Sequence, residues 1–197
     1  MRRVKTFLLA ACLFAGLATA AAAQNTNSSK TGAAASRRAE MEKTLYHRLG
    51  GMVAVTAVVD EFIRVLAADE RVNKKLARSG MNVPRIRLHL IEQVCEATGG
   101  PCKYTGLSMK KAHKNMKVTE GEFNAGVEDL VKALDKFNVP EAEKKELLGI
   151  LGGLKGDIVE VNSQETGTPL PADFKPAKPA SDAEIKAGPT IKRRGEK

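Results

Sequence analysis

The 197-residue chain has no tryptophan, few other aromatic residues, and only three histidines and three cysteines. No two cysteines have the C-x-x-C spacing that is typical of structural zinc sites. The apolar run from Phe7 to Leu17 is too short to span a membrane. These absences argue against a zinc-ribbon domain and an integral membrane protein. They leave a few histidines as the side chains with distinctive chemistry.

The first 23 residues have the composition of a secretory signal peptide. A basic start, M-R-R-V-K, precedes the apolar run, and small residues, A-T-A-A-A-A, precede Gln24. We expect cleavage near Ala23–Gln24 and export to a bacterial periplasm, with no membrane-spanning segment after cleavage. Cys12 in L-A-A-C resembles a lipoprotein cleavage site, so a lipid anchor at Cys12 is the minor alternative.

The charge of the chain excludes little. Its formal net charge is +9, and loss of the three basic residues of the signal peptide leaves +6. A basic protein can favour acidic partners or membrane surfaces. Here the lysines and arginines are spread along helical patterns and tails, and no nucleic-acid-binding motif accompanies them. We therefore expect no nucleic-acid partner.

Composition divides the chain into four parts. Residues 1–23 are the signal peptide, and residues 24–40, rich in Ser, Asn, Lys and Ala, are predicted to be a flexible leader. Residues 161–197 contain five of the eight prolines together with many lysines, which predicts a disordered tail. Residues 41–160 remain as one folded domain, which is long enough for a single core.

The patterns within this domain are helical. They cover Val53–Leu66, the segment from Val83 to Gly99-Gly100-Pro101, the segment after Thr119, and the segment from Pro140 to Ile158. Apolar residues recur in each at intervals of three and four. Thr119-x-x-Glu122 has the spacing of a capping box. No strand pattern is convincing, so the fold class is predicted to be all-α.

Two histidines, His89 and His113, lie on successive elements and are the candidate ligands. A neutral imidazole binds iron well, although a histidine in K-K-A-H-K can also lie on the surface. Cys95 and Cys102 could form a disulfide in an oxidising compartment. Together with the two histidines they could instead form a zinc site or a catalytic Cys–His pair, but the spacing favours neither.

Several motifs together resemble the truncated haemoglobins of group I. They are L-Y-H-R-L-G-G from Leu45, V-V-D-E-F-I-R-V-L-A-A-D-E-R-V from Val58, T-G-G-P-C-K-Y-T-G-L-S-M-K-K-A-H from Thr98, and the pair of patterns around N-V-P-E. The resemblance extends over about Thr44–Val159. It implies a globin-like two-over-two helical sandwich around a non-covalent haem b. The absence of C-x-x-C-H agrees with a haem that is not covalently attached.

The resemblance also assigns residues to the cofactor. His113 takes the place of the proximal iron ligand, and Met109 matches a residue that packs under the haem. Phe62 matches an apolar position that lines the pocket. Val118 and Phe123 are further candidate lining residues.

The opposite, distal side departs from the common pattern of the family. His89 falls where some cyanobacterial members carry a second iron ligand. Leu90 and Ile63 fall where a glutamine and a tyrosine are usual, and Ile86 lies one turn before Leu90. Without those polar groups, tight oxygen binding is not expected. Three roles remain open for His89: it coordinates the iron, donates to a bound ligand, or points to solvent or a haem propionate.

The resemblance implies binding or transport of diatomic ligands such as oxygen and nitric oxide at haem iron. Nitric oxide dioxygenation and peroxidase-like reactions are candidate activities. An alternative function is electron transfer or redox sensing in the periplasm, with a redox partner and the Cys95–Cys102 pair. A haem-free helical interaction domain is a third hypothesis. The protein is expected to be a monomer or a weak homo-oligomer.

Overall fold

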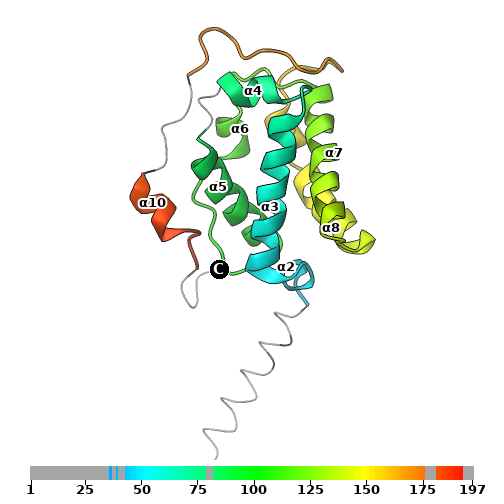
Figure 1. The fold of residues 1–197 in the computed structure, drawn as a ribbon, viewed down its shortest axis with the longest axis vertical. Coiled ribbons are helices and arrows are strands. Elements are labelled where there is room, and N and C mark those ends of the chain that lie inside the picture. Colours follow the sequence, from blue (N-terminus) through cyan, green and yellow to red (C-terminus); the bar gives the residue numbers. More distant parts are fainter. Residues whose placement is uncertain (1–35, 37–38, 40–42, 79–81, 176–180, 193–197) are drawn as a thin grey trace, which may run out of the picture. The chain divides into compact units, whose positions relative to one another are not determined.

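The computed structural model describes residues 36, 39, 43–78, 82–175 and 181–192 (Figure 1). The predicted signal peptide, Cys12, and the predicted leader apart from Ser36 and Ala39 lie outside the described residues. Among the described residues, the helices are all too short or too polar to be membrane spans. The helices are α2 (Leu45–Arg48), α3 (Gly51–Ala68), α4 (Asn73–Arg78), α5 (Val83–Ala97), α6 (Met109–Ala112), α7 (Glu120–Lys136), α8 (Glu141–Gly152), α9 (Lys155–Ile158) and α10 (Asp182–Ala187).

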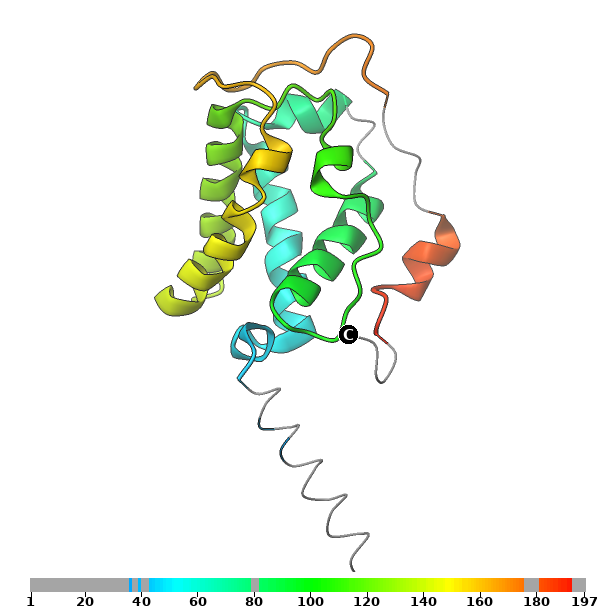
Figure 2. The ribbon, with the colours of Figure 1, turned by 180° about the vertical axis from the view of Figure 1, so that it is seen from behind.

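Helix α3 lies between α5 and α7 and contacts both, as two opposite views show (Figures 1 and 2). Helix α8 contacts α7 and α2, and the short α6 contacts α9. Helix α3 therefore packs against α5 on one side and α7 on the other, and α8 packs against α7. No β-strand occurs in the described part of the chain, which confirms the predicted all-α class.

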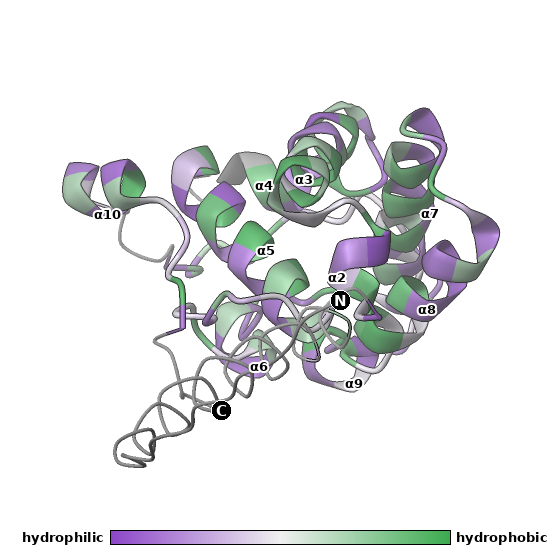
Figure 3. Cartoon of the chain, turned by 90° about the horizontal axis from the view of Figure 1, so that it is seen from below, coloured by the Kyte–Doolittle hydropathy of each residue, from purple (hydrophilic) through white to green (hydrophobic). Residues whose placement is uncertain are grey.

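Apolar side chains from all four long helices form one core. The pattern of hydrophobic and hydrophilic residues along these helices is visible in Figure 3. Burial of one such large side chain contributes about 1.5–3 kcal/mol. The core includes Val55, Val58 and Val59 of α3, Ile91 and Val94 of α5, Leu130 and Leu134 of α7, and Leu147 of α8.

Both Gly-Gly turns are required by the backbone and by packing. Gly50, which precedes α3, has a φ of 99°, and a Cβ atom there would lie 2.9 Å from the Cβ of Ala54. A Cβ atom on Gly100 would lie 2.7 Å from the carbonyl oxygen of Cys95 and from the ring of Tyr46. Only glycine therefore fits at these positions without rearrangement.

Local caps explain where the helices begin and end. The side chain of Asn82 accepts a hydrogen bond from the backbone N–H of Arg85, at 3.0 Å, and starts α5. Thr98 ends α5 and donates from its hydroxyl to the carbonyl of Val94, at 2.6 Å. Before α7, Thr119 and Glu122 form the predicted capping box.

The predicted helix from Pro140 to Ile158 is instead two helices. Helix α8 ends at Gly152, and α9 begins at Lys155. Gly153 caps α8, and its N–H donates to the carbonyl of Gly149, at 3.3 Å. Consecutive glycines weaken a helix because they have the most backbone freedom to lose, which explains the break.

Residues 161–175 and 181–192, which fall in the predicted tail, make specific contacts with the domain. Leu170 is buried, and the backbone N–H and hydroxyl of Thr168 both donate to the Glu122 carboxylate, at 2.8 and 2.6 Å. Farther along, α10 contacts α5. These segments are ordered by partners in the domain rather than by a periodicity of their own. Residues 176–180 and 193–197 lie outside the described residues.

Candidate functional site

A cavity of about 570 Å³ opens among the long helices and α6. This volume lies within the range of about 300–1,000 Å³ that is common for small-molecule and cofactor sites. Its lining is mainly apolar. Eight of the nine residues predicted to contact a cofactor lie on it: Phe62, Ile86, His89, Leu90, Met109, His113, Val118 and Phe123.

Ile63 is the exception. It is half-buried and packs against the hydrophobic core, and it is not among the described residues that line the cavity. Its neighbour Phe62 and Leu66, one turn later on α3, do line the cavity. Successive helical residues point about 100° apart, so Ile63 is turned away from the face that Phe62 presents. The cofactor contact predicted at Ile63 stays a prediction, since the side chain packs against the core beside the cavity.

His113 caps the C-terminus of α6, and its ring lines the cavity. Its Nδ1 atom lies 2.9 Å from the carbonyl oxygen of Met109. A carbonyl only accepts, so Nδ1 carries the hydrogen and Nε2 keeps a lone pair in the neutral ring. Burial lowers the pKa of His113, against the opposing effects of the Met109 carbonyl and Glu160. Such a ring is prepared to bind a metal through Nε2.

Glu160 holds the turn that follows His113. Asn115 and Lys117 have positive φ values of 65° and 55°, which residues other than glycine rarely adopt. The backbone N–H groups of both residues donate to the Glu160 carboxylate, at 2.8 and 2.6 Å. These two charge-assisted hydrogen bonds compensate for the unusual backbone.

Lys75 holds the same turn from the other side and also lines the cavity. It is only 5% exposed, and its ammonium donates to the carbonyls of Met116 and Lys117, at 2.8 and 3.0 Å, and of Pro169, at 3.4 Å. The Glu122 carboxylate lies 3.6 Å away. Lys75 therefore links α4, the turn after His113 and the chain around Pro169.

His89 lines the cavity from α5. Its side chain is 20% exposed, and its ring makes an edge contact with the ring of Tyr104, with centroids 6.0 Å apart. The Nδ1 atom of His89 lies 3.4 Å from Oε2 of Glu92. His89 is thus oriented by two neighbours, of which Glu92 is an acceptor when ionised.

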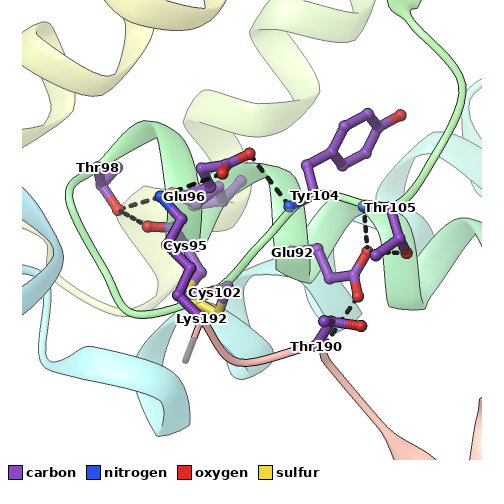
Figure 4. The surroundings of a disulfide bond; sticks show 10 residues. Glu92, Cys95, Glu96, Thr98, Cys102, Tyr104, Thr105, Thr190 and Lys192 are labelled. Atoms are coloured by element: carbon purple, nitrogen blue, oxygen red, sulfur yellow. Dashed lines mark hydrogen bonds and ion pairs between the residues drawn. A yellow bond between two sulfur atoms is a disulfide. The ribbon is translucent and has the colours of Figure 1, made fainter. Parts of the chain in front are cut away.

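Glu92 is fully buried, and neighbouring donors surround its carboxylate (Figure 4). Oε2 accepts from the backbone N–H and the hydroxyl of Thr105, at 3.0 and 2.7 Å, and Oε1 accepts from the backbone N–H of Thr190, at 2.9 Å. Burial raises the pKa of Glu92, but the hydrogen bonds from Thr190 and Thr105 outweigh this effect and leave the pKa below its ordinary value. The carboxylate is therefore ionised and already supplied with donors.

The structure joins Cys95 and Cys102 in a disulfide (Figure 4). Both residues are fully buried, and the backbone N–H of Cys102 donates to the sulfur of Cys95, at 3.2 Å. The bond connects the end of α5 to the loop that contains Tyr104 and Thr105. It leaves no thiol for the alternative catalytic Cys–His pair. Nor do the described residues contain a group of three or more side chains suited to the alternative zinc site.

Positive charge gathers around the cavity. Its lining includes one described acidic residue, Glu122, against five cationic side chains, Lys75, Arg85, Lys111, Lys114 and Lys175. An apolar cavity with cationic residues suits an apolar group that carries anionic substituents. Sequence reasoning did not assign Gln93, Leu148, Leu151 or Phe174 to the lining. The position of Gln93 one turn after His89 could have indicated that it lines the cavity. No sequence pattern indicated this for Phe174.

Comparison with known proteins identifies the family. The profile of the family described as "Bacterial-like globin" matches residues 44–160, which is more than half of the chain. The chain therefore belongs to the bacterial-like globins, and the predicted resemblance to truncated haemoglobins is confirmed.

Two curated relatives are similar over most of their own length. The group 1 truncated hemoglobin GlbN of Mycolicibacterium paratuberculosis is 33% identical over 122 residues, which are 62% of this chain and 88% of that protein. The GlbN of a Synechocystis species is 34% identical over 113 residues, 55% of this chain and 90% of that protein.

Solved structures agree with this assignment. The Fe(III) form of truncated hemoglobin from Tetrahymena pyriformis superposes with a TM-score of 0.56 at 29% identity, over 59% of this chain and 98% of that one. The 2/2 hemoglobin of Synechococcus sp. PCC 7002, in its cyanomet state with covalently attached heme, gives 0.56 at 30% identity and the same coverage. The predicted two-over-two globin fold is thereby confirmed.

Proposed function

We propose that this protein holds one non-covalent haem b in the cavity, with His113 as the proximal iron ligand, and binds diatomic ligands such as oxygen or nitric oxide. The observation that carries the proposal is the hydrogen bond from Nδ1 of His113 to the Met109 carbonyl, at 2.9 Å. It leaves Nε2 available to the iron, on a ring that lines the cavity. When bound, the haem would supply an iron centre that binds small ligands and changes oxidation state.

The remaining residues of the cavity fit a haem. Phe62, Leu90, Met109 and Phe123 would contact its apolar faces and keep water out. Arg85, Lys111 and Lys114 are cationic residues of the lining that would pair with its propionates. This division into apolar and cationic parts matches the division within the haem itself.

His89 is the candidate for a second residue that would bind the iron. Glu92 is an acceptor, so it favours the His89 tautomer with hydrogen on Nδ1 and a lone pair on Nε2. That tautomer suits coordination of iron better than donation to a bound ligand. Ile86 and Leu90, which also line the cavity, have apolar side chains and offer a bound ligand no hydrogen bond. Reversible binding of His89 would then control access of external ligands.

Haemin titration and visible spectroscopy test these assignments. We expect the apo-protein to take up one equivalent of haemin with a Soret band, and to give a low-spin, six-coordinate spectrum. The spectrum of His89→Ala should become five-coordinate or water-bound. His47→Ala, which changes a histidine of α2 outside the cavity, should leave the spectrum unchanged. Absence of haemin uptake would contradict the proposal and favour the haem-free alternative.

Electron transfer or redox sensing is a second candidate function. The Cys95–Cys102 disulfide anchors the loop whose Thr105 donates to Glu92, next to His89. Breaking the bond would therefore alter the surroundings of His89. Because both cysteines are fully buried, we expect reduction to be slow without unfolding. A haem spectrum that is identical in wild type and in a Cys95→Ala/Cys102→Ala variant would contradict the sensing function.

Export to a periplasm is part of the proposed function. A disulfide is typical of an oxidising compartment, and the first 23 residues have the composition of a signal peptide. Mass spectrometry of the protein from a bacterial periplasmic extract should find Gln24 as the first residue. A lipid-modified Cys12 would indicate the anchored alternative, and a retained Met1–Ala23 would contradict export.

A further inference from the structure

The C-terminal segment 181–192 pairs with the chain around the disulfide. The backbone N–H of Lys103 donates to the carbonyl of Thr190, at 2.8 Å, and the N–H of Lys192 donates to the carbonyl of Pro101, at 2.7 Å. Cys102 and Ile191 form an antiparallel bridge between these bonds. Two opposite views show α10 beside α5 (Figures 1 and 2). This segment lies beyond residues 44–160, which match the globin family.

One hydrogen bond connects the segment to the candidate haem site. The backbone N–H of Thr190 donates to Oε1 of Glu92, at 2.9 Å, and it crosses 98 residues of sequence to do so. The other oxygen of Glu92, Oε2, lies 3.4 Å from Nδ1 of His89. The carboxylate of Glu92 therefore contacts both the segment, through Thr190 (Figure 4), and the candidate second iron ligand.

A fully buried carboxylate stays in one orientation only while its oxygens have donors. Oε2 has two donors on Thr105, which belong to the globin domain itself. The donor to Oε1 is the backbone N–H of Thr190, which the C-terminal segment supplies. Withdrawal of the segment would remove that donor, so the carboxylate would turn toward water or toward Thr105. In either case the contact between Oε2 of Glu92 and Nδ1 of His89 would change.

We propose that residues 181–192 act through Glu92 as a positioning segment for His89, so that the docked segment favours binding of His89 to the haem iron. The proposal rests on the proposed role of His89. A docked segment keeps Nδ1 of His89 against an acceptor, which would leave the lone pair of Nε2 for a haem iron. A withdrawn segment weakens this orientation, so that His89 would compete less with external ligands for a bound haem.

A pair of substitutions at Thr190 isolates the hydrogen bond. Thr190→Pro removes the backbone N–H that donates to Glu92, whereas Thr190→Ala keeps it. The side chain of Thr190 is exposed and lies outside the globin domain, so both variants should fold. Loss of one hydrogen bond to a charged group changes an equilibrium by about tenfold. We expect Thr190→Pro to raise the rate of carbon monoxide binding to the ferrous haem protein by up to that factor.

Visible spectra and carbon monoxide kinetics of wild type, Thr190→Pro, Thr190→Ala and His89→Ala complete the test. The proposal predicts fewer six-coordinate haems and faster binding in Thr190→Pro than in Thr190→Ala, which keeps the backbone donor and loses only the contribution of the Thr190 side chain to Glu92. Glu92→Gln, which retains the size of the side chain, should resemble Thr190→Pro. If His89→Ala abolishes the six-coordinate spectrum while Thr190→Pro behaves like Thr190→Ala, the role of the segment is refuted and that of His89 stands. If His89→Ala leaves the wild-type spectrum unchanged, the proposed role of His89 itself fails.

Discussion

The Nδ1 atom of His113 lies 2.9 Å from the carbonyl oxygen of Met109, four residues earlier. The carbonyl belongs to the first residue of α6, so the one turn of helix that carries His113 also sets its tautomer. Burial lowers the pKa of the ring and keeps it neutral. Both effects prepare Nε2 to bind iron before any cofactor arrives.

Replacement of Lys75 should loosen the turn that follows His113. In Lys75→Met the carbonyls of Met116 and Lys117 lose their buried donor, which should lower the free energy of unfolding by about 1–3 kcal/mol. Urea unfolding of the apo-protein measures this change. The exposed neighbour supplies a control, since Lys74→Met should lie within about 0.5 kcal/mol of wild type. Equal effects of the two substitutions would contradict the role given to Lys75.

Two glycines should respond in opposite directions to alanine. Gly50→Ala places a Cβ on a residue with a φ of 99° and within 2.9 Å of the Ala54 side chain, so it should destabilise the protein by about 1–2 kcal/mol. At Gly149, within α8, an added Cβ would meet no described atom within 4 Å, so Gly149→Ala should be neutral or stabilising by up to about 1 kcal/mol. Thermal unfolding of the two variants would show this contrast. A Gly50→Ala variant as stable as wild type would mean that the turn before α3 is less constrained than its backbone indicates.

Glu61 should make stability depend on pH in the acid range. Hydrogen bonds from Arg64 and Lys136 lower the pKa of its carboxyl to about 2. Since the folded pKa lies below the unfolded value of about 4.3, the contribution is present above that value and is lost as the pH falls toward 2. The difference in unfolding free energy between wild type and Glu61→Gln should therefore be largest near pH 6 and shrink below pH 4.5. Urea unfolding at several pH values would measure it, and a difference that grows on acidification would have the wrong sign.

Much of the fold could be predicted from local sequence signals. Thr119-x-x-Glu122 predicts a helix start because a hydroxyl and a carboxylate at that spacing satisfy the first N–H groups, and the capping box forms. The Gly50-Gly51 and Gly99-Gly100 pairs predict turns, and three of these four glycines have positive φ values. The cavity lining follows from the family motifs, because the spacing of Met109 and His113 places both on one side of α6.

Interactions between distant residues could not be predicted in this way. Residues 161–175 have no periodicity of their own and are ordered by Glu122 and Lys75, whose side chains are contributed by other elements. Glu92 lies within an apolar stripe of α5, and its donors, Thr105 and Thr190, are 13 and 98 residues away. Ile63 packs against the core rather than on the cavity lining, because a family position gives the helix but not the packing of each of its side chains.

The haem dissociation rate of His113→Ala, measured by transfer to an excess of apomyoglobin, tests the central assignment most directly. His47→Ala is the matched control, because it removes a histidine that does not line the cavity. We predict that His113→Ala loses haem at least tenfold faster than wild type, as expected for loss of an iron–ligand bond of more than about 1.4 kcal/mol, while His47→Ala is unchanged. Equal dissociation rates for wild type and His113→Ala would contradict the assignment of His113 as the proximal ligand.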